Sequence, residues 1–297
     1  MKENYPLVSI VSVNYKQQQY TEAFLESLTH ISYPNYEVIL VDNASGNFDR
    51  KRIEDNYPET IIIESEENLG FAGGNNLGMR AASGKYFMLL NNDTEVEPDF
   101  LEPIVELMEK KPIIGLVSPK IKYSEGNNLI QYAGTIDINP ITLRGGKLGH
   151  LKEDDGTYDR VYEVPFANGA AMMISRALFE LTEGMLEDYF LYYEETDWSQ
   201  RIRNLGYKIY YQGKSTVYHK ESASVGSVSP LKSFYMSRNR LLYGYRNIKG
   251  LNKWLSIIYT VFVAYPFHTL KLFLSRDWEL IVAQWKGVFA FLQMKKH

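Results

Sequence analysis

The N-terminal third of the chain alternates β-branched runs with amphipathic helical segments, and this alternation restricts the fold more than any other feature. Residues 7–13 read Leu-Val-Ser-Ile-Val-Ser-Val, which is typical of a buried strand. Further strands are expected at residues 36–41, 60–63 and 86–90, and helices at residues 20–31 and 72–82. Strands separated by helices at this spacing indicate βαβ units. We therefore expect an α/β fold with a mostly parallel, Rossmann-like central sheet flanked by helices.

The later part of the chain is less regular. A helix is expected from Pro98 to Lys111, a strand at 113–117, an irregular β excursion over 120–164 that lies over the site, and a strand at 169–175. A helix should follow Thr196 and stop at Gly206, with short strands at 208–211 and 216–218. We expect a catalytic domain over residues 1–228, with a nucleotide half of about 1–118 and an acceptor half of about 119–228. Residues 229–297 should form a C-terminal helical extension.

Composition and charge limit the classes of function. The 297 residues include no cysteine, which excludes disulfides, thiolate metal sites and a cysteine nucleophile. The formal net charge of −4 is uneven, because seven Lys/Arg from Lys249 onward oppose only Asp277 and Glu279, which leaves about −9 on the rest. An acidic body argues against nucleic-acid binding. The first six residues carry no signal-peptide apolar core, so we expect a cytoplasmic protein.

The C-terminal segment combines basic and aromatic side chains. Residues 254–270 hold no Asp, Glu, Lys or Arg, but a bilayer-spanning helix needs about 20 apolar residues. This stretch is interrupted by Ser256, Thr260, Pro266, His268 and Thr269. We therefore expect no span but peripheral attachment to the cytoplasmic face of the membrane. The alternative is that the aromatic side chains are buried against the catalytic domain or in a homodimer interface.

Polar residues follow the expected strands, where parallel sheets collect ligands. These residues are Asn14-Tyr15, Asp42-Asn43, Glu64 and Asn91-Asn92-Asp93. A carboxylate such as Asp93 at a strand end suits Mg²⁺ or Mn²⁺ held against a diphosphate, since these cations take oxygen ligands and borrow several from phosphates. The alternative is an Asn/Asp turn that caps the next helix.

Glu194-Glu195-Thr196-Asp197 places three carboxylates beside the start of a helix. Thr196 suits the N-cap and Asp197 the first turn, which would explain Asp197 by capping alone. Glu195 is less well explained by capping, and its aromatic neighbours suit a general base in a walled pocket. His219 follows a short strand and precedes a Ser/Gly-containing loop, so it is a candidate metal or phosphate contact, although a lone histidine is more often structural.

Other phosphate-binding motifs do not fit. The glycine-rich residues 68–74 are no G-x-G-x-x-G fingerprint after a first strand, and Gly84-Lys85 is followed by Tyr86 rather than by Ser or Thr. A nucleotidyltransferase would need a glycine-rich basic loop after the first strand, where Asn14-Tyr15-Lys16 has none. A non-catalytic glycan-binding module would not need both the strand-end aspartate and the helix-start carboxylates.

The ordered set of motifs resembles family 2 of the inverting glycosyltransferases, which have the GT-A fold, and in particular its rhamnosyltransferase-like branch. The matching pieces are residues 8–15, Val41-Asp42-Asn43-Ala44-Ser45, residues 68–76, Leu90-Asn91-Asn92-Asp93-Thr94, Gly169-Ala170-Ala171-Met172, Tyr193-Glu194-Glu195-Thr196-Asp197-Trp198 and Tyr218-His219. They follow the family's order and cover roughly residues 7–225.

The resemblance implies a role for each matching position. Nucleotide-sugar contacts fall on Asn14, Tyr15, Asp42, Asn43, Gly70, Asn75 and Asn92, with Arg238 and Arg240 at the leaving diphosphate. Asn91-Asn92-Asp93 stands in the place of the family's DxD motif, so Asp93 and His219 would bind Mg²⁺ or Mn²⁺. Glu195 stands where the catalytic base stands, although aspartate is commoner there. The acceptor would be contacted by Gly169, Glu194, Asp197 and Trp198.

The implied reaction moves a sugar from a nucleotide-diphosphate donor, dTDP-rhamnose or a UDP-sugar, to a hydroxyl of a glycan or lipid-linked acceptor with inversion. Polysaccharide synthesis for the cell envelope is the expected setting. A polyprenyl-phosphate acceptor is the first alternative, and the nucleotidyltransferase and the glycan-binding module are the remaining ones.

Overall fold

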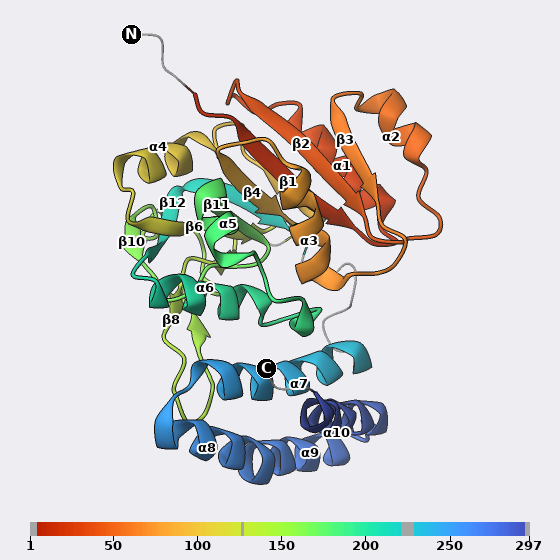
Figure 1. The fold of residues 1–297 in the computed structure, drawn as a ribbon, viewed down its shortest axis with the longest axis vertical. Helices are drawn as coiled ribbons and strands as arrows, with labels where there is room; N and C mark the ends of the chain where they lie inside the picture. Colours follow the sequence, from red (N-terminus) through yellow and green to blue (C-terminus); the bar gives the residue numbers. More distant parts are fainter. Residues whose placement is uncertain (1–4, 126–127, 221–228, 295–297) are drawn as a thin grey trace.

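A computed structural model describes residues 5–125, 128–220 and 229–294. Its main sheet has the strand order β10-β12-β6-β11-β4-β1-β2-β3, with β5 paired to β12 and β7 paired to β6. Strands β1 to β4 pair in parallel, whereas β11 runs antiparallel between β4 and β6. Helices flank this sheet, and four further helices gather at one end of the molecule (Figure 1). The predicted α/β fold with a mostly parallel sheet is confirmed.

The strands and helices have the following bounds. The strands are β1 Val8–Asn14, β2 Tyr36–Asp42, β3 Thr60–Glu64, β4 Tyr86–Leu90, β5 Thr94–Val96, β6 Ile114–Tyr123, β7 Ile130–Tyr132, β8 Thr135–Ile136, β9 Gly146–Lys147, β10 Val161–Glu163, β11 Ala171–Ser175 and β12 Lys208–His219. The helices are α1 Gln18–Leu28, α2 Arg50–Asn56, α3 Gly70–Ala81, α4 Glu102–Lys110, α5 Arg176–Thr182, the 3₁₀ turn η1 Glu187–Tyr189, α6 Glu194–Asn204, α7 Pro230–Asn247, α8 Gly250–Tyr259, the π-helical turn η2 Thr260–Ala264, α9 Tyr265–Leu274 and α10 Trp278–Gln293.

Helix α3 lies unusually close to β1 because its glycines leave room for the strand's side chains. A Cβ atom on Gly78 would stand 2.4 Å from Val11 Cγ1, and one on Gly74 would stand 2.9 Å from Val13 Cγ1. Real Cβ atoms do not approach other atoms so closely, so any larger residue would push the helix away from the sheet. The glycines therefore fix the distance between the start of α3 and the end of β1.

Several elements differ from the sequence-based expectation. Helix α2 occupies a segment for which no element was predicted, and Asp49 caps it by accepting from Arg52 N. Strand β12 is continuous over twelve residues, because a register shift absorbs the Gly213 region that had separated two short strands. Strand β6 extends to Tyr123, six residues beyond its expected end, and α5 directly follows β11.

The C-terminal helices form a small layer of their own. Helix α7 packs lengthwise on α10, while α8, η2 and α9 run on without a break (Figure 1). Their shared core contains Leu241, Tyr243, Tyr265, Val288 and Phe291. The predicted domain boundary at residue 228 lies outside the described residues.

Many apolar side chains of α8, η2, α9 and α10 are exposed, and we call these residues together the outer face. Each of its side chains is more than half exposed: Leu251, Trp254, Ile258, Phe262, Val263, Phe267, Leu270, Phe273, Leu274, Trp278, Val282, Phe289 and Leu292. The alternative, that these aromatic side chains are buried against the catalytic domain, does not hold for most of them, although Tyr265 and Phe291 are buried. The run Gly250–Leu274 is 25 residues long, and by length and composition alone it could cross a membrane, which the sequence analysis did not expect.

Candidate active site

A cavity of about 290 Å³ opens at the carboxyl ends of β1 and β4. Chain order reverses between these two strands, which is where open α/β sheets bind ligands. The residues that line the cavity are Val13, Tyr15, Asn43, Asn68, Gly70, Phe71, Asn75, Leu90, Asn91, Asn92, Asp93, Phe190, Leu191, Tyr192, His219, Leu231 and Lys232. Seven of the predicted site residues are thus brought together: Tyr15, Asn43, Gly70, Asn75, Asn92, Asp93 and His219.

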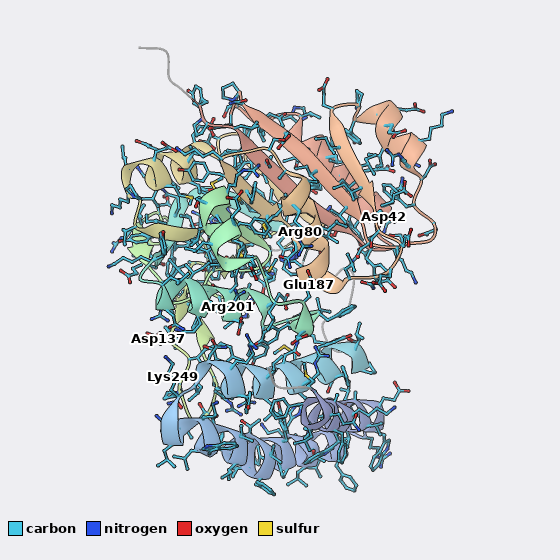
Figure 2. The ribbon with its side chains drawn as sticks, in the orientation of Figure 1. Asp42, Arg80, Asp137, Glu187, Arg201 and Lys249 are labelled. Atoms are coloured by element: carbon cyan, nitrogen blue, oxygen red, sulfur yellow. The ribbon has the colours of Figure 1, made fainter. Side chains whose placement is uncertain are left out.

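Asn14 and Asp42 lie at neighbouring strand ends but bind each other instead of lining the cavity. Asn14 Nδ2 donates to Asp42 Oδ1 over 2.7 Å, and the Ser45 hydroxyl donates to the same oxygen over 2.5 Å. Asp42 is almost fully buried at the end of β2 (Figure 2). The pair is not part of the cavity lining, and the nucleotide-sugar contact expected of Asp42 stays a prediction.

Asn43 holds the entrance of α3 in place. Its Nδ2 donates to Asn68 Oδ1 and to Gly70 O, each over 3.0 Å, and its Oδ1 accepts from Leu69 N over 2.9 Å. Gly70 has a φ of +69°, and a Cβ atom there would stand 2.3 Å from Phe190 O. Both the positive φ and the close approach of Phe190 O require a glycine at this position. The loop before α3 therefore meets the segment after η1 at the cavity wall.

Asp93 and His219 form the acidic and imidazole pair of the site. Pairing of β12 with β5 places His219 opposite Thr94, and His219 Nε2 lies 3.1 Å from Asp93 Oδ1. On its other side, His219 Nδ1 lies 2.8 Å from Gln131 Oε1, which only accepts, so Nδ1 carries a proton. His219 Nε2 therefore faces the Asp93 carboxylate, and Asn91 Nδ2 lies 3.3 Å from the same ring nitrogen.

This pair fits a divalent cation. Asp93 Oδ1 is buried and accepts no hydrogen bond from the described residues. A cation between that oxygen and Nε2 would satisfy both lone pairs, and the Nδ1–Gln131 bond would fix the tautomer in the way usual for metal-bound histidines. Within the described parts of the chain, no three His, Cys, Asp or Glu side chains group around one point. Any cation here would need further ligands from phosphate oxygens or water, as Mg²⁺ and Mn²⁺ accept.

The segment before α6 is strained. Phe190, Tyr192 and Tyr193 all have positive φ, at 61°, 69° and 76°. Such conformations cost of order 1–3 kcal/mol each and persist where the surroundings impose them. Here the surroundings are in α7: Asn239 Nδ2 donates to the carbonyls of Tyr189, Leu191 and Tyr192.

Helix α6 begins three residues earlier than the sequence suggested, at Glu194 instead of Asp197. Its first residue is Glu194 and its N-cap is Tyr193, which has no side-chain capping bond, so the expected N-cap role of Thr196 is wrong. The shift rotates the carboxylates relative to the expected arrangement. Glu195 is left half-buried near the cavity, whereas Glu194 and Asp197 turn into the protein.

Glu195 lies beside the cavity wall. A Cβ atom on Gly169 would stand 3.5 Å from Glu195 Cγ and 3.6 Å from Phe71, which lines the cavity, so Gly169 fits between the two side chains. Burial raises the pKa of the Glu195 carboxyl above its ordinary value, against the lowering effect of hydrogen bonds from Thr196 and of the Lys147 charge. A carboxylate with a raised pKa is a stronger base at neutral pH.

Three of the expected acceptor contacts are buried. Asp197 is fully buried and accepts from Tyr189 Oη, Asn247 Nδ2 and Arg201 Nε, and Trp198 is fully buried with its Nε1 bound to Thr182 Oγ1. Burial also raises the pKa of Glu194 well above its usual range. The expectation that Asp197 and Trp198 line an acceptor pocket is therefore wrong, because they anchor α6 to its neighbours.

The two arginines expected at the diphosphate lie elsewhere. Arg238 Nη2 donates to the carbonyls of Asp188 and Tyr189, and Arg240 binds the Thr142 carbonyl and lines a separate cavity. Lys232 is instead the cation that lines the first cavity among its described residues. No motif in the sequence marks Lys232, and its position depends on how α7 packs against the catalytic half.

Comparison with known proteins identifies the family. The family model described as glycosyl transferase family 2 matches residues 9–182, more than half of the chain. The chain belongs to glycosyltransferase family 2. It is a glycosyltransferase, and the predicted resemblance is confirmed.

Two curated relatives illustrate the range of the family. The hexosyltransferase Agl10 of low-salt glycan biosynthesis in Haloferax volcanii is 27% identical over 66% of this chain and 61% of its own length. An N-acetylglucosaminyl-diphospho-decaprenol L-rhamnosyltransferase of Mycobacterium tuberculosis is 23% identical over 74% of this chain and 78% of its own. The chain spans only 25% to 61% of the first relatives that it matches.

A solved structure supports the fold. The mannosyltransferase PcManGT of Pyrobaculum calidifontis, in complex with GDP-Man and Mn²⁺, aligns with a TM-score of 0.59 and 16% identity over 99% of this chain and 77% of its own. At this identity the likeness establishes the GT-A fold alone.

Removing the Asp93 carboxylate should abolish metal-dependent nucleotide binding by this glycosyltransferase. We expect UDP with Mn²⁺ to stabilise the wild-type enzyme by about 2.7 kcal/mol at 100 times Kd, and Asp93→Ala to lose this stabilisation. Thermal unfolding checks it, with circular dichroism to verify the fold and exposed Asp99→Ala as the matched control. Full transfer activity in chelator-treated enzyme would contradict the role of the metal.

The fall of kcat/KM at acidic pH should reflect the pKa of Glu195. Because a base works only when deprotonated and the Glu195 pKa is raised, kcat/KM should fall at a higher pH than for an ordinary carboxylate. Lys147→Gln removes a cation that lowers this pKa, so the acidic limb should move to still higher pH. Lys110→Gln, on α4, is the control. If Lys147→Gln leaves the acidic side of the pH profile of kcat/KM unchanged, and Glu195→Gln still shows the same fall in acid, the titrating group is not Glu195.

Proposed function

We propose that this enzyme transfers a sugar from a nucleotide-diphosphate donor to an acceptor hydroxyl by single displacement with inversion. The observation that carries this proposal is that a cation-binding pair and a candidate base lie at separate places around one cavity. Asp93 and His219 form a cation-binding pair at the strand ends, and Glu195 lies beyond Phe71 at another wall. No second carboxylate lines the cavity among its described residues, so no nucleophile is available for a double displacement.

In this mechanism Glu195 accepts the proton of the acceptor hydroxyl as its oxygen attacks the anomeric carbon. The bond between that carbon and the diphosphate breaks on the opposite face, which inverts the configuration. Asp93 and His219 would hold Mg²⁺ or Mn²⁺, which supplies Lewis-acid stabilisation of the leaving diphosphate. Lys232 adds a positive charge on the same side. PcManGT was solved in complex with Mn²⁺, which supports a divalent cation in this role.

The donor is proposed to lie along the carboxyl ends of the strands. Tyr15, Asn43, Gly70, Asn75 and Asn92 line that path, and the buried Asn14–Asp42 pair stiffens it from below. The candidate donors are dTDP-rhamnose and UDP-sugars. The name of the Mycobacterium tuberculosis relative favours rhamnose and a diphosphate-linked lipid acceptor. The O-antigen and low-salt glycan names of other relatives favour synthesis of cell-envelope polysaccharide.

We further propose that the outer face of the C-terminal helices lies on the cytoplasmic membrane surface. Lys253, Lys271, Arg276 and Lys286 accompany its apolar side chains, and basic residues beside aromatic ones favour an anionic lipid interface. Ser256 and Thr260, counted against membrane insertion in the sequence, are buried on the opposite side. A helix with one buried and one exposed side suits lying in the interface better than crossing the bilayer.

The reaction is tested with a panel of nucleotide sugars and lipid-linked acceptors. We expect one donor to be consumed only with acceptor present, and the anomeric coupling constant in the product NMR spectrum to show inversion. Glu195→Gln keeps the size of the side chain but not its basicity, so turnover should fall by about 10²-fold or more with UDP binding retained. Retention of configuration, or near-normal turnover of Glu195→Gln, would contradict the mechanism.

The membrane contact is tested by flotation with liposomes that contain anionic phospholipid. Wild-type protein should float at low salt, and Trp254→Glu combined with Phe262→Glu should not, because the two side chains are 57% and 73% exposed on the outer face. Leu205→Glu, a similarly exposed position at the end of α6, is the matched control. Equal flotation of the double variant, or none by the wild type, would leave a second copy or another protein as the partner of this face.

A further inference from the structure

A second cavity of about 400 Å³ lies between the catalytic half and the C-terminal helices. Its walls come from the turn that joins β8 to β9, from Tyr193, and from α7, α9 and α10. The mechanism proposed above uses none of this space. The chemistry of its walls therefore has to be explained separately.

The charge of the second cavity is positive. Arg144 and Arg240 line it, and its described lining includes no Asp or Glu. Neither arginine forms an ion pair with a described carboxylate, whereas most other described arginines do. Two unneutralised guanidinium groups around one space favour an anion with several oxygen atoms.

Arg240 has one hydrogen-bond donor, its Nε–H group, without an acceptor among the described residues. Its Nη2 group donates to the Thr142 carbonyl and its guanidinium carbon lies 5.8 Å from the centre of the Tyr265 ring, so the side chain is held in place. Its Nε atom is buried and has no acceptor among the described residues. An unsatisfied buried donor is costly, and a bound anion would remove that cost.

The second cavity adjoins the proposed base. Tyr193 lines it and directly precedes the Glu194-Glu195 pair, while Tyr192 lines the first cavity. Lys147, whose charge acts on Glu195, follows the cavity residue Gly145 by two positions. An anion in the second cavity would thus lie on the side of Glu195 away from the donor.

The outer end of the second cavity leads toward lipid. Helix α9 supplies Ala264 at its N-cap, Tyr265 and His268 to the wall, and the same helix exposes Phe267 and Leu270 on the outer face. A molecule with an anionic group in the cavity can therefore continue along apolar side chains. Phosphate-linked lipids combine these two properties.

We propose that the second cavity binds the phosphate or diphosphate group of a lipid-linked acceptor, with the lipid along the outer face and the sugar extending past Tyr193 to Glu195. This inference rests on the proposed function and names its acceptor class. The bound phosphate would hold the acceptor sugar at its anomeric carbon. A hydroxyl on the far side of the sugar ring would then face Glu195. Arg144 and Arg240 would act as binding residues, not as catalytic ones.

The test is isothermal titration calorimetry of the full-length protein with decyl diphosphate below its micelle concentration. We expect saturable binding by the wild type, and a Kd raised about tenfold by Arg144→Gln, since loss of one charge-assisted bond has roughly that effect. Arg240→Lys, which keeps the charge but loses the fork, should weaken binding as well. Arg160→Gln is the matched control, because Arg160 is exposed on the approach to β10 and outside both cavities.

Competing ligands separate the sources of the anion. Decyl glucoside, which has the chain but no charge, should bind far more weakly, and inorganic pyrophosphate, which has the charge but no chain, should bind more weakly too. Equal binding of pyrophosphate would overturn the lipid part of the proposal. Unchanged binding by Arg144→Gln, or displacement of decyl diphosphate by UDP with Mn²⁺, would overturn the site itself. Absence of UDP binding with decyl diphosphate binding intact would instead reject the proposed donor site.

Discussion

Parallel pairing of β1 with β2 on one side and β4 on the other is the constraint on which the rest of the site depends. It brings Asn14, Asp42 and the Asn91–Asp93 turn to one edge of the sheet. The small residues of α3 then allow that helix to lie directly against β1, so the helix start and the strand end meet at a fixed distance. Side chains that are far apart in the sequence therefore lie along one edge of the sheet.

Polar groups at this edge divide into two kinds. Asn14, Asp42 and Asn43 spend their hydrogen bonds on each other and on the loop before α3. Asp93 and His219 are arranged differently: His219 Nδ1 bonds to Gln131, while its Nε2 faces Asp93 Oδ1, an oxygen that accepts no hydrogen bond from the described residues. Polar groups whose hydrogen bonds are made within the protein fix the shape of the cleft. A buried oxygen without a hydrogen-bond donor, such as Asp93 Oδ1, is available to bind a ligand.

The sequence predicted the strand-end residues well because strand periodicity depends on local pattern. Seven of the predicted site residues line one cavity for this reason. Prediction from the sequence failed where long-range contacts determine the structure. The strained Phe190–Tyr193 turn sets the start of α6, so Thr196 is not the N-cap. For the same reason Asp197 and Trp198 are buried. Lys232 and Arg240 could not be placed from the sequence, since their positions depend on how α7 packs against the catalytic half. Asn239 carried no motif at all.

The three carbonyls held by Asn239 bear on the modularity of this enzyme. They belong to the turn that leads into α6, and the amide that binds them comes from α7, which lies beyond the residues 9–182 that the family model matches. A shorter protein cut before α7 would keep every strand of the described sheet yet lose the amide that binds this turn, in which Phe190, Tyr192 and Tyr193 have positive φ. Removal of the C-terminal helices would therefore also change the turn that leads to Glu195, so these helices help to shape the proposed reaction centre.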